Sequence, residues 1–453
     1  MHHAETTGAK VRLFLNIMWP ILVTQVGYHA MNLTDTIMAG RAGTADLAGV
    51  AIGGSLWMPA FVALTGVLLA VTPVVSQLTG AGRAERIAPT VTQASYLSLA
   101  LSAIVFVLGA LFLDPVLSMM HLDPEVHGIA KEYLVGLSYG LIPLFLSSVI
   151  RNYFDAQGHT NVTMAIVLFA LPCNVFLNYV LIFGKFGFPE LGGAGTGYAT
   201  AATYWIILAI SLWLVFRLER PRQQRLFRVW PRPSLGAFRE LLNIGVPMGL
   251  SIFFEASIFS IVTLLMGSAF DTVTIASHQA AISFAGMMFM MPLSISMALT
   301  ILIGFEIGAG RPSHAGRYAG IGVTAAVGII AAAAVLLYFN RAFVASWFTS
   351  SPDVAAMTQQ FLIFVIFFQL SDAAQAALQG ALRGYKDVTV PFVTALVAYW
   401  AIGIPAGYAL SWTTLGPYGY WVGITAGLTC AALGFGVRLR IVQRRIERQR
   451  TAA

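Results

Sequence analysis

The 453-residue sequence is 58% hydrophobic and only 10% charged, with a formal net charge of +7. Soluble proteins carry about 25% charged residues, so this composition excludes a soluble globular chain and favours a protein that lies mostly within a membrane. The two cysteines, Cys173 and Cys430, each lie in an apolar run, which excludes a disulfide framework and a CxxC metal site.

Apolar runs long enough to cross a bilayer recur along the whole chain. The first begins near Leu13 and runs past Ala30, which is too long for the core of a signal peptide, so we expect it to remain as a membrane helix. A spanning helix needs roughly 20 mostly apolar residues. The sequence therefore predicts an all-α polytopic membrane protein of about twelve transmembrane helices, at 13–38, 47–76, 91–113, 128–150, 162–183, 195–216, 239–267, 273–305, 318–340, 355–382, 389–412 and 418–437.

The basic residues predict how these spans are oriented. With the N-terminus inside, 22 of the 26 lysines and arginines fall in inside segments. The four that fall outside are Arg41, Lys131, Lys185 and Arg341. We therefore expect a multi-pass protein of a bacterial inner membrane with both termini cytoplasmic. We also expect it to be monomeric. The positive charge then faces anionic lipid headgroups, and no nucleic acid is expected as a partner.

Short motifs in the first half of the chain recur in the second half at an offset near 228 residues. FLNIMWP at Phe14–Pro20 matches LLNIGVP at Leu241–Pro247, and GAGR at 80–83 recurs at 308–311. Six spans per half is an even number, so both halves enter the membrane in the same direction, as in a parallel repeat. We expect an N-terminal lobe at 1–216, a cytoplasmic linker at 217–238 and a C-terminal lobe at 239–453.

Three carboxylic acids lie inside predicted spans, namely Asp35, Glu255 and Asp372. No lysine or arginine lies centrally in any predicted span, and an unpaired buried carboxylate is strongly disfavoured. Each acid is then protonated, hydrated or bound to a mobile cation, as a carrier coupled to protons or sodium requires. Na⁺ bound by Glu255 and Asp372 is one such arrangement. The alternative is a neutral carboxyl group that is hydrogen-bonded within the protein.

Polar side chains lie near these acids in the helical pattern. Gln375 is on the same face as Asp372, and Ser251 lies one turn before Glu255. Asn174 and Asn178 share a face of the fifth span, and Thr200 lies in the sixth. Such groups can ligate Na⁺ or relay H⁺, but they also form ordinary hydrogen bonds between membrane helices.

A run of phenylalanine and methionine in the eighth span is a candidate substrate surface. Phe284, Met287 and Met288 precede Pro292, and adaptable apolar side chains of this kind suit varied ligands. Core packing or lipid contact explains such a run equally well. The sequence contains no P-loop, HExxH or GxSxG motif, so we expect neither an enzyme nor a cofactor.

Longer segments resemble the multidrug and toxic compound extrusion (MATE) transporters, and within them the NorM-like branch. They are PILVTQVGYHAMNLTDTIMAG at 20–40, ALTGVLLAVTPVVSQLTGAG at 63–82, GVPMGLSIFFEASIF at 245–259 and QGALRGYKDV at 379–388. The resemblance covers nearly the whole chain. It implies two six-helix lobes and antiport. It also implies that Asp35 is the acid of the N-terminal lobe and that Glu255 and Asp372 are the paired cation-binding acids of the C-terminal lobe.

The sequence departs from the family pattern at two positions. Sodium-type NorM members carry a tyrosine one turn before the tenth-helix aspartate, where this chain has Phe368, a further candidate for the substrate cavity. Members with an N-lobe proton site carry a second acid in the fifth helix, where this chain has Asn178. The coupling ion, H⁺ or Na⁺, therefore stays open at this point.

We accordingly expect an efflux antiporter that exchanges small organic cations for inward-moving H⁺ or Na⁺. A lipid-linked oligosaccharide flippase of the wider superfamily is the alternative, but its anionic pyrophosphate substrate needs a basic cavity. A channel would need neither the unpaired acids nor the duplicated architecture.

Overall fold

The computed structural model describes residues 3–218, 221 and 223–451, which form helices joined by short turns. In the first half these helices are α1 (Thr7–Ala42), α2 (Thr44–Leu68), α3 (Val71–Gly80), α4 (Ala84–Met119), α5 (Pro124–Ser138), α6 (Leu141–Ala156), α7 (Thr160–Ile182) and α8 (Ala194–Arg217). The α2–α3 and α5–α6 pairs each correspond to one predicted span. The second pair bends by 49° at Tyr139–Gly140, where a Cβ on Gly140 would lie 2.8 Å from the Cα of Ala201.

The second half repeats this order. Its helices are α10 (Leu235–Ala269), α11 (Thr272–Gly308), α12 (Pro312–Ser346), α13 (Pro352–Gly384), α14 (Thr389–Leu396), the π-helix η1 (Val397–Gly403), α15 (Ile404–Ser411) and α16 (Tyr418–Thr451). The α14–η1–α15 segment is the predicted eleventh span, and the π-helical turn within it is a feature that apolar periodicity does not predict. Every predicted span thus corresponds to one helix or one interrupted helix.

Ten of these helical segments are long and apolar enough to cross a membrane, or eleven when the bent α5–α6 pair is counted as one span. α1 is not among the ten, because asparagine, glutamine, histidine and threonine interrupt its apolar stretch. The all-α multi-pass class predicted from the sequence is confirmed.

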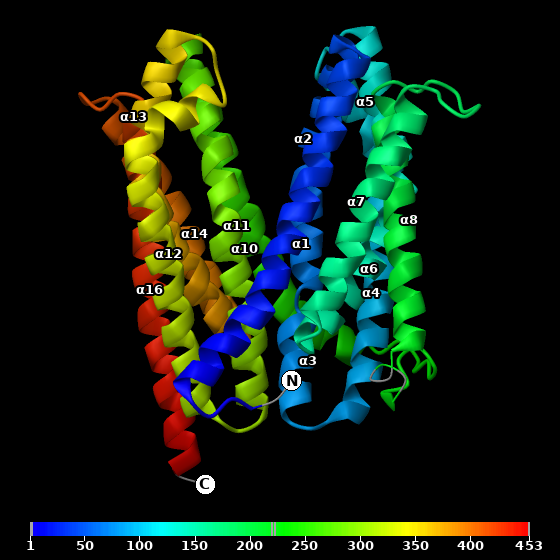
Figure 1. The fold of residues 1–453 in the computed structure, drawn as a ribbon, viewed down its shortest axis with the longest axis vertical. Coiled ribbons are helices and arrows are strands. Elements are labelled where there is room, and N and C mark those ends of the chain that lie inside the picture. Colours follow the sequence, from blue (N-terminus) through cyan, green and yellow to red (C-terminus); the bar gives the residue numbers. More distant parts are fainter. Residues whose placement is uncertain (1–2, 219–220, 222, 452–453) are drawn as a thin grey trace. The chain divides into compact units, whose positions relative to one another are not determined.

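The chain forms two compact units. One contains Pro20–Gly249, and the other contains Met1–Trp19 together with Leu250–Ala453. Within each unit the long helices run alongside one another as a bundle (Figure 1). The boundaries fall inside α1, at Pro20, and inside α10, two residues after Pro247. The division into two lobes at 217–238 expected from the sequence remains a prediction.

The N-terminal half of α10 packs closely on α2, in the unit formed by Pro20–Gly249. A Cβ on Gly249 would lie 2.9 Å from Val67 Cγ2, so only glycine lets the two helices approach this closely. The segment before α10 lies on the same unit, where Gln93 Nε2 donates to the carbonyl of Arg232 at 2.7 Å. Of the predicted linker, Glu219, Arg220 and Arg222 lie outside the described residues.

The repeated GAGR motif forms the same turn twice, once in each unit. Gly82 has φ +68° and Gly310 has φ +70°, a conformation that favours glycine. The backbone amide of Arg83 donates to the carbonyl oxygen of Leu78 at 3.0 Å, and that of Arg311 donates to the carbonyl oxygen of Glu306 at 2.8 Å. Because these donors and acceptors are also 228 residues apart, the backbone follows the repeat that the sequence predicts.

Candidate functional site

In the Pro20–Gly249 unit, Asp35 of α1 accepts hydrogen bonds on both carboxylate oxygens. Asn178 Nδ2 of α7 donates to Oδ1 at 2.5 Å, and Thr200 Oγ1 of α8 donates to Oδ2 at 3.0 Å. The same Asn178 amide donates to Asn174 Oδ1 at 3.2 Å, and Asn174 Nδ2 reaches Thr203 Oγ1 at 3.4 Å. The structure therefore joins Asp35, Asn174, Asn178 and Thr200 into one network across three helices.

One atom of this network has no partner. Asn178 is fully buried, and its Oδ1 accepts no hydrogen bond from the described residues. A buried amide oxygen without a donor is costly, whereas a proton on Asp35 or a cation beside it would satisfy that oxygen. The network can therefore hold one positive charge in addition to its present hydrogen bonds.

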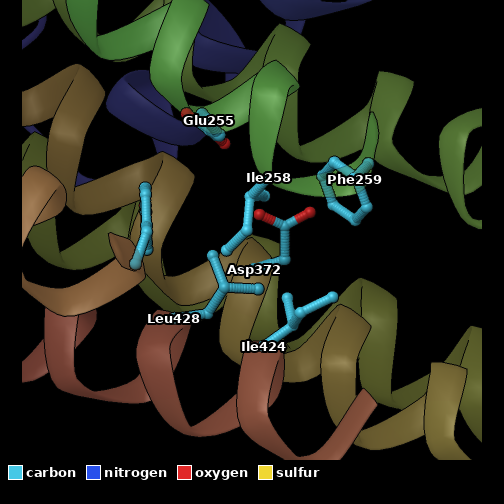
Figure 2. Close-up of a pocket in the computed structure, with 7 residues that line it drawn as sticks. Glu255, Ile258, Phe259, Asp372, Ile424 and Leu428 are labelled. Carbon is cyan, nitrogen blue, oxygen red and sulfur yellow. The ribbon is translucent and has the colours of Figure 1, made fainter. Parts of the chain in front are cut away.

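In the other unit, Glu255 of α10 and Asp372 of α13 line one small cavity. Its walls are Ile258, Phe259, Tyr399, Ile424 and Leu428, from α10, η1 and α16. Figure 2 shows the Asp372 carboxylate between Ile258 and Phe259, directed to the Glu255 side of the cavity. The sequence positions of the two acids are far apart, and helix packing brings them to the same space.

Neither acid has a hydrogen-bond or ion-pair partner within the described part of the chain. Asp372 is buried, Glu255 is half-buried, and the other residues around the cavity are apolar apart from Tyr399. The cavity holds about 10 Å³, roughly what one water-sized species needs. Pockets for drug-sized molecules measure about 300–1,000 Å³, so this space fits a cation and excludes a drug.

The sequence places no lysine or arginine centrally in a predicted span, and the structure adds a buried arginine just beyond the tenth one. Arg383, assigned from the sequence to an inside segment, lies in the last turn of α13 and is buried. Its guanidinium interacts electrostatically with Glu255 and donates from Nη2 to Gln379 Oε1 at 2.9 Å. Hydropathy did not indicate this position, because α13 extends beyond the apolar run and carries Arg383 into the protein interior.

The supporting polar residues of this unit do not line the cavity. Gln375 is fully buried, and neither its Nε2 nor its Oε1 has a partner among the described residues. Ser251 is also buried, one turn before Glu255 on α10. Their proposed supporting roles remain predictions, with Gln375 the better placed because its side chain has unused donors and acceptors.

The candidate substrate residues are divided between two places. The Phe368 ring is buried and packs edge-on against Phe259 and Trp421, at centroid distances of 5.6 and 5.4 Å, so it supports the cavity wall. Phe284, Met287 and Met288 lie on α11 and do not line this cavity, and Met287 is 47% exposed. A role of the α11 residues in substrate binding remains a prediction.

Comparison with known proteins identifies the family. The MatE family model matches residues 20–180 and 247–409. The chain belongs to the MatE family. The first residues of the two matched segments, 20 and 247, are 227 positions apart, in agreement with the internal repeat.

Curated relatives of this MatE protein match it from end to end. A probable multidrug resistance protein NorM of Halalkalibacterium halodurans is 52% identical, over 99% of this chain and 98% of the relative. A protein of the same name from Bacillus subtilis is 48% identical, over 98% of both chains. The NorM-like resemblance is therefore confirmed.

Solved structures share the fold. The MATE transporter VcmN of Vibrio cholerae in its bent form has a TM-score of 0.87 at 19% identity, covering 97% of this chain and 98% of VcmN. The eukaryotic MATE transporter AtDTX14 has a TM-score of 0.81 at 20% identity, covering 96% and 99%.

Sequence reasoning missed two residues that lie near the acids of this MatE protein, Arg383 and Tyr399. Arg383 belongs to QGALRGYKDV, a segment used for the resemblance, and lies one residue beyond the predicted tenth span. Tyr399 lies in an apolar run, where one tyrosine is unremarkable in composition. A buried hydroxyl in a π-helix gives no sequence signal, because hydropathy does not distinguish a π-turn from an α-turn.

Proposed function

We propose that this protein is a secondary active multidrug efflux antiporter that exports cationic or amphipathic compounds in exchange for H⁺ or Na⁺. The observation that carries the proposal is the cation-sized cavity lined by Glu255 and Asp372, two carboxylates without hydrogen-bond partners. The multidrug resistance names of relatives 48–52% identical support the substrate class. The duplicated architecture and the basic distribution support a carrier in a bacterial inner membrane with cytoplasmic termini.

Charge balance explains how such a cavity couples two transport events. Two carboxylates in apolar surroundings repel one another, and a bound proton or Na⁺ relieves that repulsion. A cationic drug that binds to the same unit gains the most electrostatic binding energy when no ion occupies the cavity. Ion and drug then weaken one another's binding by the same factor, as linkage requires. Because the cavity excludes a drug by size, this competition acts through charge and conformation.

Asp35 supplies a second acid, in the other unit. Its hydrogen bonds to Asn178 and Thr200 fix the carboxylate between α1, α7 and α8, and the unpartnered Asn178 oxygen supports a proton or cation at this position. We infer that Asp35 is also required for export, with Asn174, Asn178 and Thr200 setting its geometry.

Nothing in the cavity favours the flippase alternative. A site for an anionic pyrophosphate needs lysine or arginine in its walls. The residues that line this cavity are two acids and five uncharged residues.

The proposal is tested by transport in proteoliposomes with separately imposed gradients. Purified protein is reconstituted, and movement of the cationic dye ethidium is followed under a pH gradient without sodium, and then under a sodium gradient at equal pH. At least one gradient should drive dye against its own gradient, and dissipating that gradient should abolish the movement. Dye movement that ignores both gradients would rule out this antiport.

A further inference from the structure

Tyr399 has a buried hydroxyl group without a partner beside the two acids. Its side chain is 1% exposed, and its oxygen forms no hydrogen bond with the described residues. It nevertheless lines the cavity with Glu255 and Asp372, and it interacts electrostatically with both. An unsatisfied buried hydroxyl is costly, so a hydroxyl kept in this position indicates a partner that binds and leaves.

The π-helix η1 places this hydroxyl. A π-turn contains one more residue than an α-helical turn. With a regular turn between α14 and α15, the Tyr399 side chain would therefore point in a different direction. π-turns of this kind occur frequently at functional sites. The interruption at Val397–Gly403 thus coincides with the residue that enters the cavity.

Close packing holds the π-helix in place on two sides. On one side, a Cβ on Gly427 of α16 would lie 2.8 Å from the Ala398 carbonyl oxygen and 3.1 Å from the Gly403 Cα. On the other side, Trp400 packs edge-on against Phe254 of α10 at a centroid distance of 5.6 Å. Its indole N–H donates to the Phe254 carbonyl at 3.4 Å, directly before Glu255. The element that carries Tyr399 is therefore fixed to the helix that carries Glu255.

We propose that Tyr399 is a third ligand residue of this cation site, whose hydroxyl oxygen binds the ion held by Glu255 and Asp372. The proposal rests on the proposed function. A hydroxyl oxygen adds a ligand without adding charge, so the cavity gains affinity and keeps the charge balance that its acids set. The same lone pairs accept either Na⁺ or the proton carried by one of the carboxyl groups.

The test compares two tyrosine-to-phenylalanine substitutions in the full-length protein. Ethidium is bound to the purified protein and released with NaCl at constant ionic strength, and separately with acid at constant salt. Tyr399→Phe should raise the half-saturating ion concentration about 10-fold, corresponding to loss of one ligand contact worth about 1.4 kcal/mol. Maximal release and the affinity for ethidium without the ion should stay unchanged. Tyr420→Phe, which removes the hydroxyl of another buried tyrosine of the same unit that does not line the cavity, should match the wild type.

Asp372→Asn separates failure of the inference from failure of the proposed function. If Asp372→Asn weakens release and Tyr399→Phe matches the wild type, Tyr399 is not a ligand and the ion site stands. If Asp372→Asn also matches the wild type, the ion is not bound in this cavity and both ideas fail.

A second variant tests the positioning without touching Tyr399. Gly427→Ala should displace η1 and raise the half-saturating concentration in the same direction. Gly328→Ala on α12 adds the same methyl group where no atom lies within 4 Å, and it should have no effect. Equal behaviour of both alanine variants, at unchanged thermal stability, would contradict the role of η1.

Discussion

The two units hold their intramembrane acids in opposite ways. In the Pro20–Gly249 unit, neutral donors from two further helices satisfy both oxygens of Asp35. In the other unit, Glu255 and Asp372 share a cavity in which no donor within the described residues reaches them. A satisfied carboxylate is stable with nothing bound, whereas an unsatisfied pair needs a proton or a cation. We therefore expect the larger part of the ion-binding energy to come from the second unit.

This difference is not one of backbone. The GAGR turns repeat with the same geometry, but the acids do not repeat, because the positions 228 residues from Asp35, Glu255 and Asp372 are Thr263, Gly27 and Leu144. Gly27 shows why: a Cβ there would lie 2.6 Å from Val167 Cγ1, so no acid fits. A duplicated fold has thus acquired two different polar sites through local packing.

The largest effect is expected at Asp35. Asp35→Asn keeps the side-chain volume and one of the two acceptor oxygens, so the protein should fold and insert. It cannot cycle a proton and carries no negative charge, so drug export should fall about 10- to 100-fold, the loss expected for a charged interaction. Cells that express the variant at wild-type level and keep normal resistance would refute this role.

The same Asp35→Asn protein is also tested for ion-driven release of bound ethidium, which reports on the proposed ion site of the other unit. Because we propose that the ion binds in the other unit, the half-saturating ion concentration should change less than about 2-fold, within the scatter of independent sites. A large shift would mean that the ion binds at Asp35.

A smaller effect is expected at Arg383, the buried cation beside Glu255. Arg383→Gln removes a positive charge that opposes a mobile cation, so the half-saturating ion concentration should fall several-fold, while the ion-free protein should be less stable. Arg317→Gln, which removes an exposed arginine of α12, serves as the charge control. An unchanged or higher half-saturating concentration in Arg383→Gln would show that the guanidinium does not act on the site.

The smallest effect concerns a helix cap that only one unit has. Asp271 caps α11 and accepts hydrogen bonds from the Thr274 hydroxyl at 2.5 Å and from its amide at 3.0 Å, whereas the equivalent cap of α2 is Gly43. These hydrogen bonds lower the pKa of the Asp271 carboxyl from its ordinary value. Asp271→Gly should lower the apparent melting temperature by about 1–2 °C at pH 7.

The pH dependence of this cap has a definite sign. Because the folded-state pKa is depressed, the stabilisation is present above the unfolded-state pKa and is lost as the pH falls through the folded-state value. Melting curves of wild type and variant should therefore converge in acid. A difference that persists unchanged at low pH would assign the effect to backbone freedom at glycine.

Hydropathy predicted every helical segment, because each buries an apolar surface over a length set by the bilayer. Spacing on one helix face also predicted the Asn174–Asn178 pair, and both lie in the Asp35 network. The bend at Gly140 and the π-turn around Tyr399 could not be predicted, because they depend on contacts with α8 and α16. Arg383 was missed for a related reason: the depth of a residue depends on how far its helix extends beyond the apolar run.

The central claim is that Glu255 and Asp372 bind one ion together, and a double-mutant cycle on ethidium release tests it most directly. Glu255→Gln and Asp372→Asn should each raise the half-saturating ion concentration about 10-fold or more, and the double variant should lose little beyond the weaker single variant. Such non-additivity is expected when both acids serve one site. Losses that add in the double variant, or single variants that release ethidium as the wild type does, would contradict a shared ion site in this cavity.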